Sequence, residues 1–169
     1  MDAVSSEIGS VVFVLCGGIR AAAPLPDSPR ACVCCGEVPL VLIDVSADGL
    51  AHTLAHEIAH LTVRALDEAS LRDGSHWNDA LWAELNPPGF QYSLSYAGSP
   101  TAEFTVEAGL EDAYFISRYS KTFRTEDAAT LMEAYVRLGH DSLIFKNAHI
   151  KRKLESFLCA VEYYLLSGR

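Results

Sequence analysis

The chain has 169 residues, and its 22 acidic side chains outnumber its 13 Lys and Arg, which gives a net charge of −9. This balance argues against nucleic acid as a partner, because proteins that bind phosphate backbones carry basic surfaces. Half of the residues are hydrophobic and 21% are charged, as in a globular protein, and no apolar run reaches the ~18 residues of a membrane span. We therefore expect one globular domain without a membrane-spanning segment.

The N-terminal part, residues 1–37, is expected to hold one strand followed by a loop rich in Pro, Gly and Cys. The apolar run from Ile8 to Gly18 lacks the positive leader of a signal peptide, so a buried strand is the preferred interpretation. The chain has five cysteines, an odd number, which favours a reducing, cytoplasmic location. Secretion stays open as an alternative, with a signal removed before residue 1.

A possible structural metal site lies in the same segment, where Cys32 and Cys35 form a C-x-x-C. A structural zinc needs four ligands, and the sequence contains no second C-x-x-C to supply the other two. An ordinary turn is therefore the favoured interpretation, with a structural metal as the alternative.

The remaining chain, residues 38–169, is expected to form the main domain. Its apolar periodicity and its Gly, Pro and Asn breaks predict the following elements: a strand over Val38–Val45, a helix over Leu50–Glu68, a short helix over His76–Leu85, a strand or ordered loop over Phe90–Tyr96, a helix over Glu126–Leu138 and a long helix over Asp141–Leu166.

Local signals add detail to these helices. Asp48 or Ser46 is the expected N-cap of the first helix and Thr125 that of the helix ended by Gly139. The expected core face of the first helix carries four apolar residues at helical spacing, Leu54, Ile58, Leu61 and Ala65. The basic run 151–153 is expected to be a solvated helix face.

The strongest chemical signal is the H-E-x-x-H formed by His56, Glu57 and His60 inside the first predicted helix. Residues four apart lie one above the other on a helix, so both imidazoles can reach one Zn²⁺. Glu57 follows the first ligand directly, where its carboxylate can take a proton from a metal-bound water. The motif therefore predicts His56 and His60 as metal ligands and Glu57 as a general base.

A catalytic zinc usually has three protein ligands, so one more is needed. Glu68 lies about two turns beyond His60 on the same helix, too far along the axis to converge on the metal. The residues themselves leave His76, Glu84 and Glu126 as candidates, with three further glutamates behind them, Glu103, Glu107 and Glu111.

Two further blocks resemble the bacterial zinc-binding metallopeptidases of the gluzincin type. The first block, with Trp82, Asn86, Phe90 and Tyr92, resembles their W-x-x-x-N-P-x-x-F-x-Y signature. The second joins the stretch 115–119 to Glu-Asp-Ala-Ala at 126–129 and resembles their F-[VI]-[ST]-x-Y followed by E-D-x-A-E. The resemblance covers about 80 residues, from His52 to Val136, and departs from the pattern at Thr130, where the family has its second glutamate.

The arrangement is also similar to the catalytic domain of anthrax lethal factor, in which a Tyr precedes the glutamate ligand by seven residues. Tyr119 and Glu126 have the same interval. The resemblance thus implies Glu126 as the third zinc ligand and Tyr119 as the donor to the oxyanion of the reaction. The position of Glu126 is consistent with this role, because a carboxylate in the first turn of a helix is stabilised by the helix dipole.

A second resemblance competes with the first. The segment 54–61 is also similar to the helix of peptidases that cleave phage and stress-response repressors, whose acidic ligand lies on a nearby helix. The segment 77–87 echoes that helix, but His76 or Trp77 stands where the acidic ligand belongs. This interpretation would give the third position to His76 or Glu84.

Together these observations predict an α+β, zincin-like fold, with a small mixed sheet packed on the H-E-x-x-H helix and a helical C-terminal half. The predicted function is a zinc metallopeptidase that holds one Zn²⁺ and cleaves a peptide or protein substrate. The alternatives are a non-catalytic zinc-binding regulatory module, which Thr130 favours, a repressor-cleaving peptidase with another third ligand, and an amidase for smaller substrates.

Overall fold

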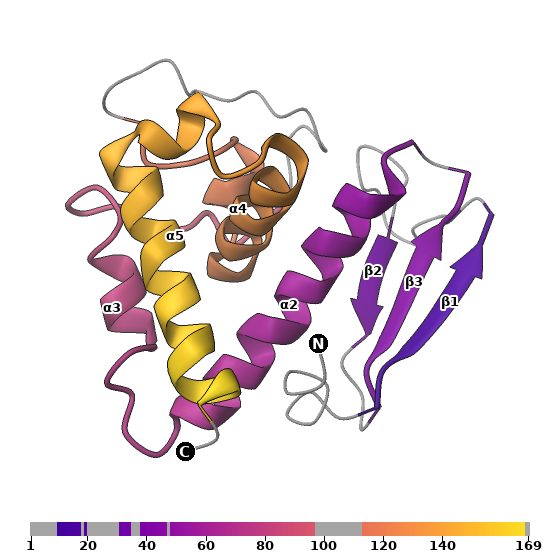
Figure 1. Ribbon diagram of the computed structural model, residues 1–169, viewed down its shortest axis with the longest axis horizontal. Helices are drawn as coiled ribbons and strands as arrows, with labels where there is room; N and C mark the ends of the chain where they lie inside the picture. Colours follow the sequence, from indigo (N-terminus) through magenta and orange to yellow (C-terminus); the bar gives the residue numbers. More distant parts are fainter. Residues whose placement is uncertain are drawn as a thin grey trace.

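The computed structural model describes residues 10–17, 19, 31–34, 38–46, 48–96 and 113–167. It is a mixed α+β structure in which a small sheet lies on one side of a long helix and the other helices on its opposite side (Figure 1). Within the described residues, every helix is too short or too polar to cross a membrane.

The sheet has three described strands, β1 (Val12–Cys16), β2 (Ala31–Cys34) and β3 (Leu40–Asp44). Their order is β1-β3-β2, with β1 parallel to β3 and β2 antiparallel to it. The sheet is thus mixed, as predicted.

Two predictions about these strands are wrong. β2 lies in a segment expected to be a loop, because Pro and Gly on either side hide a run of only four residues. β1 is exposed where a buried strand was expected, and Leu15 is 65% exposed. The cause is its position, since α2 (Leu50–Ser70) packs on β2 and β3 while β1 lies beyond β3 (Figure 1).

The helix α2 begins at the predicted residue and runs two residues further than predicted. Its N-cap is Gly49, in the left-handed conformation with φ 83°, and no side chain caps it, so the predicted caps Asp48 and Ser46 are wrong. Ser46 instead donates from its backbone N–H to Asp44 at 2.9 Å, which closes the turn after β3.

Two opposite faces of α2 are buried, whereas the sequence indicated one. Leu61 packs with the sheet residues Val41 and Ile43, and Leu66 packs in the core of the helical half. Ile58, expected in the core, is 39% exposed because it lies between these two faces. The long helix is therefore the layer that joins sheet and helices.

The middle of the chain contains α3 (Asp79–Ala83), which is shorter than predicted and is capped by Asn78, and α4 (Arg124–Leu138). The N-cap of α4 is Phe123 without a side-chain bond, so Thr125 is not the cap, while Gly139 ends the helix as predicted. The segment 90–96 forms an ordered loop and not a strand.

The C-terminal segment is interrupted where a single helix was predicted. A 3-10 turn (Leu143–Lys146) precedes α5 (Ala148–Val161), which continues as a π turn (Glu162–Leu166). Asn147 starts the new helix by accepting the N–H groups of His149 and Ile150. Lys153 also contradicts its prediction as a solvated residue, since it is 1% exposed and ion-paired, whereas its two basic neighbours are exposed.

Candidate metal centre

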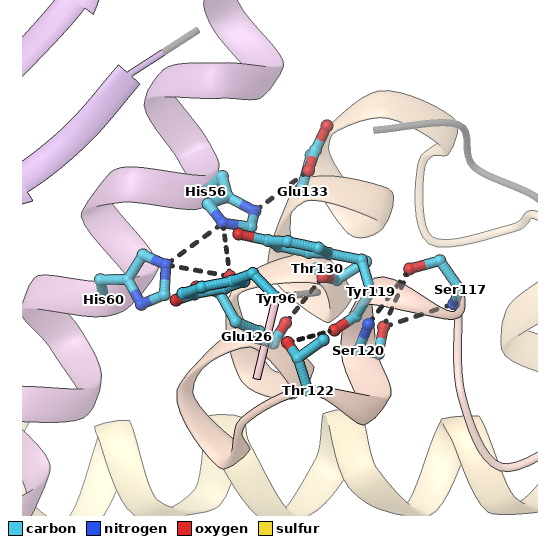
Figure 2. Close-up of polar contacts among 10 residues, drawn as sticks. All are labelled: His56, His60, Tyr96, Ser117, Tyr119, Ser120, Thr122, Glu126, Thr130 and Glu133. Carbon is cyan, nitrogen blue, oxygen red and sulfur yellow. Dashed lines mark hydrogen bonds and ion pairs between the residues drawn. The ribbon is translucent and has the colours of Figure 1, made fainter. Parts of the chain in front are cut away.

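Three potential metal ligands come together where α2 and α4 lie side by side (Figure 2). Nε2 of His56 lies 3.1 Å from Oε2 of Glu126 and 3.2 Å from Nε2 of His60. Nε2 of His60 lies 3.4 Å from the same carboxylate oxygen. One atom from each residue therefore faces the other two, and the group can hold a metal ion.

The second partner of His56 is compatible with this interpretation. Its other ring nitrogen, Nδ1, lies 3.1 Å from Oε2 of Glu133. An ionised carboxylate has no hydrogen to donate, so this oxygen accepts the hydrogen bond. In a neutral ring, Nδ1 then carries the hydrogen and Nε2 presents a lone pair to Glu126. Converging lone pairs repel unless a cation lies between them, so these donors fit a metal ion.

The electrostatics of the pair also favour a positive charge at this place. Burial by itself lowers the pKa of His56, but hydrogen bonds to Glu126 and Glu133 outweigh it and raise that pKa to about 10. Burial likewise raises the pKa of Glu126, but its hydrogen bonds to His56 and His60 are stronger and hold that pKa well below its usual range. Either a proton or a metal cation can supply the charge.

Glu133 is a residue of this centre that the sequence analysis missed. It lies seven residues after Glu126 on α4, which is two turns along the same helix face, so helical periodicity offers a signal for it. The hydroxyl of Thr130, the residue that departs from the metallopeptidase motif, donates to the backbone carbonyl of Glu126 at 2.6 Å. Glu133, one turn later, provides the carboxylate that orients His56.

Glu57 is buried beside this cluster, with 6% of its surface exposed. Burial raises the pKa of its carboxyl group, while the neighbouring His56 and His60 act to lower it. Its charge also contributes to the raised pKa values of Tyr96 and Tyr119. A buried carboxylate with a raised pKa is a stronger base than an exposed one.

Two tyrosines lie against the cluster, and the sequence indicated only one of them. The ring of Tyr119 lies 6.2 Å from that of His56, and burial, with repulsion from Glu126, raises its pKa. The ring of Tyr96 stacks on Tyr119 at 5.8 Å, and its hydroxyl donates to Oε1 of Glu126 at 2.8 Å. Figure 2 shows both rings extending toward the histidines of α2.

The residues of the W-x-x-x-N-P-x-x-F-x-Y block do not contact the cluster through their polar groups but hold the start of α4. Trp82 and Tyr92 both donate to Oδ2 of Asp127, at 3.2 and 2.8 Å, and Asn86 donates to the Tyr92 hydroxyl at 3.1 Å. Lys153 completes the network with a 2.7 Å ion pair to the same Oδ2. Asp127 is the neighbour of Glu126, so the block fixes the turn that carries the ligand.

The other third-ligand candidates lie outside the cluster. His76 stacks on Tyr163 with ring centroids 4.0 Å apart, and Glu84 is exposed at the end of α3. Glu103, Glu107 and Glu111 lie outside the described residues, and so does Cys35, which leaves the C-x-x-C without a test. Burial, with the neighbouring Cys34, raises the pKa of Cys32 to about 11.

Comparisons with protein-family models, with curated protein sequences and with solved structures found no match to this chain. The resemblance to metallopeptidases therefore depends on the motifs, and the assignment of function depends on the site.

Proposed function

We propose that the protein is a zinc-dependent metallopeptidase with a zincin-like arrangement of its helix and sheet. The observation that carries the proposal is the convergence of His56, His60 and Glu126, because two imidazoles and one carboxylate are a ligand set found in catalytic zinc sites. Neither His76 nor Glu84 joins this group, which favours Glu126 over the alternative third ligands.

In this proposal the zinc supplies Lewis acidity and lowers the pKa of a water molecule. Glu57 accepts the proton of the attacking water and delivers it to the leaving amine, a role that suits its buried carboxylate. Tyr119 donates its hydroxyl to the negative charge that develops on the carbonyl oxygen. Its raised pKa keeps this phenol protonated at neutral pH, as a donor must be.

A peptide substrate is supported by the position of β2. This strand lies at the edge of the described sheet and packs against α2, the helix that carries Glu57 (Figure 1). The free side of an edge strand presents N–H and C=O groups that can pair with an extended peptide. Such pairing would lay a substrate along the sheet next to Glu57.

Zinc content and peptide cleavage of Glu57→Gln test the proposal, with Glu68→Gln as the matched control. Glu68 lies on the same helix, exposed and bonded to Arg64. We expect one zinc per chain in both variants and a loss of cleavage of about 10²–10⁴-fold in Glu57→Gln only. Wild-type protein that binds no zinc would overturn the proposal. Zinc-loaded protein that cleaves no peptide, with a cellular function unaffected by Glu57→Gln, would establish the regulatory module instead.

A further inference from the structure

The two oxygens of the Glu126 carboxylate have different partners. Oε2 lies 3.1 Å from Nε2 of His56 and 3.4 Å from Nε2 of His60, whereas Oε1 accepts the hydroxyl of Tyr96 at 2.8 Å. A hydrogen bond to one oxygen of a carboxylate fixes the rotation of the group and leaves the other oxygen directed elsewhere. Here the second oxygen is directed at the two histidines.

The loop that carries Tyr96 is held in a costly conformation. Leu94 has φ 53°, in the left-handed region that a leucine rarely adopts, although its side chain is 72% exposed and packs little. Backbone hydrogen bonds from Ser93 to Lys121 and from Leu94 to Thr122 keep the loop in place. Strain of this kind persists where the surroundings impose it, often at functional sites.

These bonds tie the loop to the segment that leads into α4. Lys121 ends the 3-10 turn that begins with Tyr119, and the ring of Tyr96 packs between Tyr119, at 5.8 Å, and Phe123, at 4.7 Å. Phe123 is the N-cap of α4, three residues before Glu126. The side chain of Tyr96 is therefore held on the segment whose carboxylate it contacts.

We infer that Tyr96 is a positioning residue for the metal centre, which holds Glu126 so that a single carboxylate oxygen, Oε2, is presented to the ion. The inference rests on the proposed metal site and adds a residue that no motif indicated. Because the carboxylate is already oriented, less freedom is lost when the ion binds. Tyr96 acts through Glu126. Tyr119 also has a hydrogen-bonding interaction with Glu126, but its proposed role is to donate to the substrate.

Zinc affinity, measured by competition with a chromophoric chelator, tests this role in Tyr96→Phe. The variant keeps the ring and its stacking but loses the hydroxyl, so we expect affinity to fall by about 10–100-fold, as for other outer partners of metal ligands. The metal-free variant should stay folded, with a thermal midpoint lowered only by the few degrees that one lost hydrogen bond costs, which separates positioning from a role in the fold.

Tyr114→Phe is the matched control, since the ring of Tyr114 stacks on His149 of α5 and not on Tyr119. Its zinc affinity should equal that of wild type. If Tyr96→Phe binds zinc within about twofold of wild type, the positioning role is wrong. The same holds if the variant binds zinc normally but no longer cleaves peptide, because Tyr96 would then act on the substrate. If the wild type itself binds no zinc, the proposed metal site fails as well.

Discussion

Two buried polar clusters begin at adjacent residues of α4 and differ in how their charge is balanced. Glu126 faces His56 and His60, whose ring nitrogens lie 3.1 and 3.4 Å from its Oε2. Asp127, the next residue, instead receives the ammonium group of Lys153 together with two further donors. One carboxylate is paired with a lysine, and the other with two histidines that could also hold a metal ion.

The pKa values of the two carboxyl groups are shifted in opposite directions. Hydrogen bonds from the histidines lower the pKa of Glu126 in spite of its burial, whereas complete burial raises the pKa of Asp127 in spite of Lys153. Polar burial alone thus does not mark a functional site. The distinguishing feature is the kind of partner, since histidines can bind either a proton or a metal ion whereas Lys153 supplies its own charge, and four changes can test this difference.

The largest effect is expected from Lys153→Met, which leaves Asp127 buried without its cation. Removal of one partner of a buried pair costs about 3–5 kcal/mol, so the free energy of unfolding should fall by that amount in urea titrations. The double variant Lys153→Met with Asp127→Asn should recover part of the loss, because the amide is neutral. An unchanged free energy of unfolding would show that the network is dispensable.

Glu126→Gln should weaken zinc binding and leave the protein folded, whereas Lys153→Met should lower stability. An amide carries no charge for the metal, so zinc affinity in chelator competition should fall by more than about 100-fold, beyond the loss caused by an outer partner. The metal-free protein should remain folded, because the carbonyl oxygen of the introduced amide would still accept a hydrogen bond from Tyr96. Zinc affinity equal to that of wild type would remove Glu126 from the ligand set.

Glu133→Gln tests the carboxylate behind His56 and is expected to weaken zinc binding by about 10–100-fold. The amide bonds the ring nitrogen more weakly than the carboxylate at 3.1 Å, so the ligand becomes less basic. Glu155→Gln, an exposed glutamate paired with Lys151 on α5, is the matched control and should bind zinc normally. Equal affinities in the two variants would contradict the role of Glu133.

The last test is the pH dependence of the stability of the metal-free protein. The pKa of His56 is raised from 6.5 to about 10, so its stabilisation is complete below the unfolded pKa and is lost as the pH rises through the folded one. The free energy of unfolding should therefore fall between about pH 7 and pH 9, by at most about 1.4 kcal/mol per pH unit. His56→Gln should abolish this slope in urea titrations, and a slope of opposite sign would contradict the assignment.

The residues of the candidate site differ in how visible they were in the sequence. His56 and His60 follow from one motif inside a strongly periodic helix. Glu126 followed from a resemblance, because its place in the centre depends on α4 lying beside α2, 70 residues away in the chain. Glu133 and Tyr96 belong to no motif, and a single glutamate or tyrosine carries no signal until its neighbours are known.

The secondary structure also contains elements that the sequence predicted and elements that it did not. The helix from Leu50 was predicted to within two residues at its end, since its apolar pattern and freedom from Gly and Pro act locally. The strand β2 and the break at Asn147 were missed, because a four-residue strand depends on its pairing with β3 and a short turn resembles a helix in its apolar spacing.

The sequence by itself determined that two histidines lie on one helix face, because a spacing of four residues has this meaning in any α-helix. Tertiary structure alone decided which carboxylate meets them, that Lys153 is buried with Asp127, and that Tyr96 contacts Glu126. The physical reason is that these side chains are buried and brought together only when α2, α4, α5 and the loop at 90–96 pack against one another. Similar side chains on an isolated helix would be solvated.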